Sequence, residues 1–87
     1  MTGTDKICEL ISNYFSKCKS EGKTFVTLKA SDIEEMFDVS KQIYNAPDKK
    51  RYPAICSAMK RMMKENDEIV FSPKSGQSPL FEIKYYL

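Results

Sequence analysis

Apolar residues recur at steps of three and four from Thr4 to Lys19, which is the spacing of one stripe along an α-helix. Thr4 or Asp5 suits the N-cap of this helix, and Ser20-Glu21-Gly22 provides a polar, glycine-containing stop. The pattern predicts a first helix whose buried stripe consists of Ile7, Leu10, Ile11, Tyr14, Phe15 and Cys18.

The segment that follows carries a strand signal and then a helix signal. Residues 24–28 (TFVTL) are β-branched and aromatic, so we expect one brief strand whose partner lies elsewhere in the chain. Ser31 and Glu34 have the spacing of a capping box, which predicts a second helix ending near Asp38. Residues 40–52 lack sustained periodicity and contain the turn sequence NAPD, so we expect a loop with at most one helical turn near Ile43.

A third helix and a hairpin are expected in the remainder of the chain. Pro53 suits the first turn of a helix running to about Glu65. Residues 68–71 predict a strand, residues 72–79 a polar hairpin loop, and residues 80–87 the returning strand. The third helix would bury Ile55, Cys56, Met59, Met62 and Met63, and the last strand would bury Phe81, Ile83 and Tyr85.

Composition limits the chemistry that this chain can perform. Its 87 residues, 41% hydrophobic and 30% charged, suit one globular domain over residues 1–87. It has no histidine, and Gly3, Gly22 and Gly76 form no phosphate-binding loop. We therefore expect a non-enzymatic protein with no catalytic residue, no cofactor and no metal.

The cysteines and the apolar runs bear on the cellular compartment. Cys8, Cys18 and Cys56 are an odd set without CxxC spacing, which favours packing roles in a reducing compartment over a disulfide framework or a thiolate metal site. No apolar run is long enough for a membrane span, and residues 1–10 do not have the form of a signal peptide. We expect a cytoplasmic protein, associated with the nucleoid, or nuclear in a eukaryote, without membrane contact.

The order of predicted elements resembles the winged helix-turn-helix family. The resemblance rests on residues 31–40 as the first motif helix and turn, residues 53–64 as a recognition-like helix, and residues 72–79 as the wing tip. It implies an α+β fold, a small winged helix of three helices with a short strand and a C-terminal two-stranded antiparallel wing. One departure is the interval of about a dozen residues between Ser40 and Pro53, longer than in a compact helix-turn-helix.

Positive charge is concentrated on the segment that such a fold would present to DNA. The net charge is only +2, but residues 41–64 hold seven basic residues and one acidic residue, a charge of +6, and the rest of the chain carries −4. At 100° per residue, the polar residues of the third helix lie opposite its apolar stripe. The candidate contacts to duplex DNA are Lys49, Lys50, Arg51 and Tyr52 at the helix entrance, Ser57, Lys60, Arg61 and Lys64 on the helix, and Lys74 on the wing.

These observations predict a DNA-binding module, most simply a transcriptional regulator, but they leave alternatives open. A charged helix face is often only solvated, and winged-helix domains also serve as protein-protein interaction modules within larger complexes. The methionines suit core filling or an adaptable partner groove. Residues 85–87 carry more apolar surface than an edge strand should expose, so they pack either on the first helix or on a second subunit, which leaves a homodimer or protein partner open.

Overall fold

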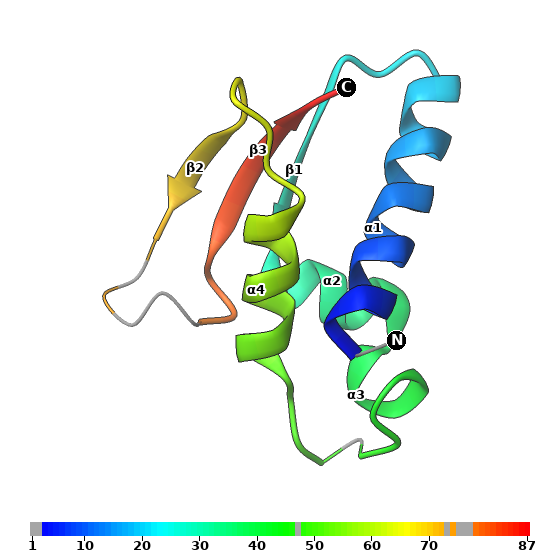
Figure 1. Ribbon diagram of the computed structural model, residues 1–87, viewed down its shortest axis with the longest axis vertical. Coiled ribbons are helices and arrows are strands. Elements are labelled where there is room, and N and C mark those ends of the chain that lie inside the picture. Colours follow the sequence, from blue (N-terminus) through cyan, green and yellow to red (C-terminus); the bar gives the residue numbers. More distant parts are fainter. Residues whose placement is uncertain (1–2, 47, 73, 75–77) are drawn as a thin grey trace.

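In the computed structural model, the chain folds into an α+β domain with helices on one side of a small antiparallel sheet (Figure 1). The structure describes residues 3–46, 48–72, 74 and 78–87. Pro47 and half of the expected wing tip, residues 73 and 75–77, therefore lie outside the described residues. The elements are α1 (Gly3–Ser20), β1 (Phe25–Lys29), α2 (Ala30–Phe37), α3 (Val39–Gln42), α4 (Tyr52–Arg61), β2 (Glu68–Phe71) and β3 (Glu82–Tyr86).

The three strands form a sheet in the order β1-β3-β2, so the returning strand β3 is the partner that the isolated first strand required. In the antiparallel pair of β1 and β3, Phe25 lies opposite Tyr86. In the hairpin of β2 and β3, Ile69 lies opposite Ile83, but an irregularity between Ile69 and Phe71 interrupts the register. Both β1 and β2 are consequently edge strands.

The periodicities predicted most of the buried faces correctly, but Leu10, Tyr14 and Phe15 of the stripe expected on α1 are only partly buried. Ile7, Ile11 and Cys18 of α1 are buried, and so are all three inward residues expected on the last strand. The ring of Tyr85 lies 4.8 Å from that of Phe15, and its hydroxyl donates a 2.8 Å hydrogen bond to the carbonyl of Met59. Tyr85 therefore packs inside its own chain, against α1 and α4.

The start of α2 differs from the expected capping box. The helix begins at Ala30, directly after β1, and the N–H of its N-cap residue Lys29 donates to the Asp32 carboxylate at 2.9 Å. Glu34 is only 3% exposed and accepts the N–H of Ser40 at 3.1 and 3.3 Å. Because β1 leads directly into α2, the first turn of α2 begins earlier in the chain than predicted. Glu34 therefore points inward, where its carboxylate binds the backbone of Ser40 in the next segment.

The described part of the chain contains four helices where three were expected, because the segment after α2 contains the short helix α3. Asp38 separates the two helices in the left-handed conformation, with φ of 48°. Aspartate tolerates this region better than most residues because its short polar side chain bonds locally. The single helical turn expected near Ile43 thus lies at residues 39–42, and the described residues 43–46 and 48–51 before α4 are irregular.

The third predicted helix, α4, ends at Arg61 and not near Glu65. Asp67 explains the early end, because its carboxylate accepts the backbone N–H of Lys64 at 2.8 Å and that of Tyr86 at 2.8 Å. These two bonds turn the chain after α4 and attach the turn to β3. The side chain of one buried aspartate therefore sets where the helix stops and where β2 begins.

Candidate nucleic-acid interface

The helix α4 has one face in the core and the opposite face in solvent. Ile55, Cys56, Ala58 and Met59 are buried, and Met62 and Met63 pack at the edge of the same core. Methionine here fills the core. The residues predicted to face outward, Ser57, Lys60, Arg61 and Lys64, are exposed. Helical phase therefore identified this surface correctly from the sequence.

The cations on this surface point in different directions. The Lys60 ammonium lies 5.4 Å from the centroid of the Phe81 ring, on the side of α4 that faces the hairpin. Such a distance allows a cation–π attraction that holds the stem of the side chain along the ring. The Lys60 side chain accordingly lies beside Phe81, just before β3, and remains exposed.

Arg61 points the other way, toward α1. Its Nη1 donates to Oδ1 of Asp5 at 2.6 Å, and both side chains are about half exposed. The hydrogen bond to Asp5 raises the pKa of Arg61 above its already high ordinary value. The two residues are 56 positions apart, so no local pattern in the sequence could have paired them.

Lys64 lies where α4 gives way to β2. Its ammonium is 3.4 Å from Oδ2 of Asp67, whose side chain is fully buried. Burial opposes ionisation of Asp67, but the N–H groups of Tyr86 and Lys64 and the Lys64 ammonium outweigh it and lower the pKa of the carboxyl. Asp67 remains an anion held mainly by backbone donors, with Lys64 as an additional partner.

The loop before α4 contributes two exposed lysines and the half-buried Arg51. Lys49 and Lys50 are exposed, and the Lys50 ammonium lies 3.8 Å from Oε1 of Glu34. The Arg51 guanidinium stacks 4.9 Å from the centre of the Tyr44 ring, so it is half-buried against the loop itself. Tyr52 is also half-buried and packs on the core. Arg51 and Tyr52 therefore support the helix entrance more than they line its outer surface.

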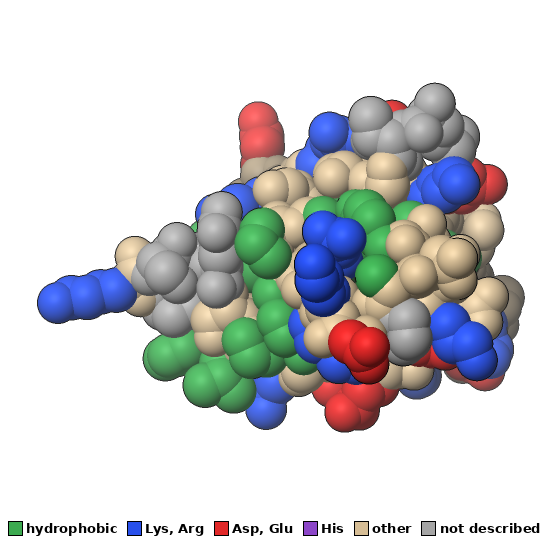
Figure 2. All heavy atoms as spheres, turned by 90° about the horizontal axis from the view of Figure 1, so that it is seen from below, with side chains coloured by type: hydrophobic (Ala, Val, Ile, Leu, Met, Phe, Trp, Pro, Cys, Tyr) green, Lys and Arg blue, Asp and Glu red, His purple; other side chains and the backbone are tan. Residues whose placement is uncertain are grey.

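Figure 2 shows the end of the molecule where this loop and the hairpin lie. Lys and Arg side chains are spread over the face with Asp and Glu side chains among them, and hydrophobic side chains gather toward the hairpin. Lys74 is exposed on the hairpin. The predicted residues thus form a discontinuous basic surface. Three carboxylates, those of Asp5, Glu34 and Asp67, lie among the cations, and no pattern in the sequence indicated that they would.

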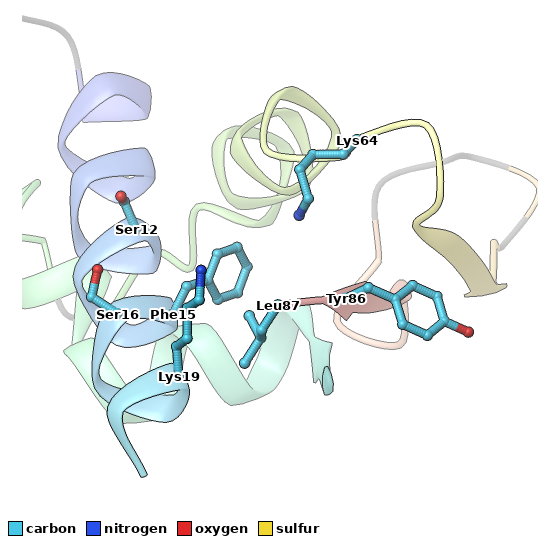
Figure 3. Close-up of a pocket in the computed structure, with 7 residues that line it drawn as sticks. All are labelled: Ser12, Phe15, Ser16, Lys19, Lys64, Tyr86 and Leu87. Atoms are coloured by element: carbon cyan, nitrogen blue, oxygen red, sulfur yellow. The ribbon is translucent and has the colours of Figure 1, made fainter. Parts of the chain in front are cut away.

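A small pocket lies beside this surface, between α1 and the end of β3 (Figure 3). Lys19 and Lys64 reach toward it from opposite sides, and Phe15 forms part of its wall. Its volume of about 240 Å³ is less than the ~300–1,000 Å³ typical of small-molecule sites. The pocket adds the Lys19 ammonium to the basic end of α4, where Lys64 already lies, but it does not have the form of a substrate cavity.

The thiols of Cys8 and Cys56 show no activation. Cys8 is half-buried and Cys56 is buried, and burial raises the pKa of both thiols. Their Sγ atoms lie 3.8 Å from the carbonyl of Ala58 and 3.6 Å from that of Ser78, as weak donors would. A protonated, hydrogen-bonded thiol is a poor nucleophile, so the cysteines fit the expected packing role.

Within the described part of the chain, no group of three or more His, Cys, Asp or Glu side chains could hold a metal ion. Among the same residues, no helix is both long and apolar enough to cross a membrane. No family model, curated protein or solved structure matches the sequence or the fold.

Proposed function

We propose that this protein is a winged-helix module that binds duplex DNA through α4, the loop before it and the hairpin. The order of elements, with its C-terminal hairpin beside α4, supports the resemblance to the winged helix-turn-helix family. The short helix α3 occupies part of the long interval between Ser40 and Pro53. One observation carries the proposal: α4 is held by the core along one face, and its opposite face is exposed and basic.

The dimensions of α4 suit a major groove. Ten residues give a helix about 15 Å long and, with side chains, about 10–12 Å across, close to the ~12 Å width of the groove. Lys60 and Arg61 would lie nearest the base edges, where a lysine or arginine can bind the O6 and N7 acceptors of guanine. Lys49 and Lys50 at the helix entrance and Lys74 on the hairpin would contact phosphates.

The carboxylates of Asp5, Glu34 and Asp67 are compatible with this proposal because none of them needs the neighbouring lysine or arginine to remain in place. Asp67 keeps two backbone donors and Glu34 keeps the Ser40 N–H when the lysine beside each one moves away. The pair of Arg61 and Asp5 is exposed, and exposed ion pairs are weak. Phosphates can therefore replace these carboxylates as partners of the cations at small cost.

The test is fluorescence anisotropy of a labelled random duplex at two salt concentrations. Neutralising three to five phosphates should reduce the logarithm of the association constant with a slope of about −0.9 per phosphate against the logarithm of the salt concentration. The triple variant Lys60→Glu, Arg61→Glu, Lys64→Glu should abolish binding. A matched variant with the same charge change, Lys6→Glu, Lys17→Glu, Lys23→Glu, alters exposed residues of α1 and the turn after it and should retain most of the affinity.

Two outcomes would overturn the proposal: a duplex that never binds at low salt, or equal losses in the two triple variants. A second candidate function would then stand, a protein-protein interaction module. It is favoured by the exposed apolar residues of the hairpin, Ile69, Val70, Phe71 and Leu80. Cations that already have carboxylate neighbours also suit a protein partner of mixed charge.

A further inference from the structure

The outer edge of the hairpin is an unusually apolar surface. In the sheet order β1-β3-β2, one side of β2 carries backbone N–H and C=O groups with no neighbouring strand among the described residues. All four residues of β2 are exposed, and Ile69, Val70 and Phe71 have 48%, 54% and 47% of their surface in solvent. Leu80, at 56%, borders the same area together with Phe71. An edge strand of this kind is a template for pairing with another strand.

We infer that β2 is a self-association site, at which the β2 strands of two copies pair antiparallel about a two-fold axis. The two sheets would then join into one sheet of six strands. The contact is isologous, so the same residues are buried on both copies and the assembly closes at two. This inference concerns the free protein and stands whether or not the domain binds DNA.

Charge at the ends of β2 favours a second copy in the antiparallel direction. Glu65 and Glu68 are exposed at the amino end of the strand, and Lys74 is exposed beyond its carboxyl end. Antiparallel pairing places the acidic end of one strand beside the basic end of the other, so each contact occurs twice. The strand is therefore complementary to itself in charge as well as in its apolar middle.

The other edge of the sheet has the opposite arrangement, which explains why β2 and not β1 would pair. Lys23 precedes β1 and Lys29 ends it, and both are exposed. Antiparallel pairing of two β1 strands would bring these lysines together, and like charges opposite one another destabilise a strand pair. Lysines at an edge are a common protection against such pairing.

The contact is small, which determines the protein concentrations at which self-association can be measured. A short strand with its apolar neighbours covers less than the ~800 Å² per partner of a standard stable interface. Association should therefore be weak and reversible, with a dissociation constant in the micromolar range or above. Sedimentation equilibrium of the DNA-free protein, from micromolar to millimolar concentration, measures it directly.

Val70 provides the decisive variants because it lies in the middle of β2, beside the proposed two-fold axis. Val70→Lys and Val70→Glu each place a charge next to its own copy, so each should weaken self-association at least about tenfold. An equimolar mixture of the two variants should recover a dimer, because the lysine of one copy then meets the glutamate of the other. The matched control is Phe25→Lys on the β1 edge, where Phe25 is 48% exposed against 54% for Val70, and it should not change the association.

Far-UV circular dichroism and thermal unfolding first establish that each variant is folded, as expected for substitutions at exposed positions. A wild-type protein that remains monomeric at millimolar concentration would overturn the inference. A dimer that persists in both Val70 variants, or one that Phe25→Lys disrupts instead, would also overturn it. Failure of DNA binding leaves all of these results unaffected, so the two proposals are tested separately.

Discussion

The helix α4 and the strand β2 follow one another in the chain, and each leaves an exposed surface, but the two surfaces have opposite chemistry. Residues 57–64 expose polar and cationic groups opposite a buried apolar stripe, which is the usual division of an amphipathic helix. Residues 69–71 expose three apolar side chains in succession at the edge of a sheet. The first surface suits contact with a polyanion, and the second suits pairing with another strand.

The turn between them shows how close the two surfaces are. Asp67 binds backbone N–H groups on both sides of the turn, at Lys64 and at Tyr86, and the Lys64 ammonium lies beside it. One buried carboxylate thus fixes the end of the cationic surface and the start of the apolar one. Substitutions in the core, at the turn and at a surface ion pair should therefore differ in the size of their effects on stability and binding.

The largest difference is expected between two isoleucines, one on each element. Ile55 of α4 is completely buried, and Ile55→Ala should reduce the free energy of unfolding by about 2–5 kcal/mol, since it leaves a cavity in the core. Ile69 of β2 is half exposed, and Ile69→Ala should cost less than about 1 kcal/mol. Urea unfolding of both variants measures the difference, and similar losses would show that the β2 edge is as important to the core as α4.

A smaller effect is expected at the turn. Asp67→Asn retains an acceptor oxygen but sets an amide N–H₂ against a backbone donor, so it should cost about 1–3 kcal/mol at pH 7. The folded-state pKa of Asp67 is lowered relative to the ~3.9 of an unfolded aspartate. The stabilisation from its charge is therefore complete above about pH 4 and is lost as the pH falls through the lower, folded-state pKa.

This pH dependence is measured from urea midpoints between pH 7 and pH 2. The midpoint of the wild-type protein should fall in the acid part of this range more steeply than that of Asp67→Asn, which has no carboxyl to titrate at this position. Parallel acid profiles for the two proteins would show that Asp67 does not stabilise the turn through its charge.

The smallest effect is expected at the ion pair between α1 and α4. Asp5→Asn removes the carboxylate beside Arg61, and the melting temperature should change little because exposed ion pairs contribute little to stability. If α4 binds DNA, the released guanidinium should raise the affinity for a duplex about two- to threefold, an effect that salt diminishes. Anisotropy titrations alongside the wild type test this, and a weaker-binding variant would mean that Asp5 positions Arg61 for its contact.

Much of the local structure could be predicted from the sequence. The steps of three and four placed Ile7, Ile11 and Cys18 in the core, and alternation placed Ile83 and Tyr85 there. The expected strand at residues 68–71 has the same bounds in the structure, and Gly22 adopts the left-handed conformation, with φ of 86°, in the turn that it was expected to make. These features depend on neighbours within one or two turns of the chain, and their pattern is therefore visible in the sequence.

The errors occurred where a residue's partner is distant or its orientation depends on a neighbouring element. The spacing of Ser31 and Glu34 matched a capping box, but the direct passage from β1 into α2 turned Glu34 toward Ser40. The early end of α4 depends on Asp67, which is tied to β3 at Tyr86. Helical phase correctly predicted that Arg61 is exposed but could not predict that Asp5 of α1 would be its neighbour.

The sequence alone determined which faces of the helices and strands are apolar, where the chain turns, and that positive charge is concentrated in residues 41–64. Those properties follow from side-chain chemistry and from the fixed periods of helix and strand. Only the tertiary structure decided that β3 lies between β1 and β2, that acidic side chains lie among the cations, and that β2 is left as an apolar edge. Such contacts join residues far apart in the chain, and they form only when the whole core closes.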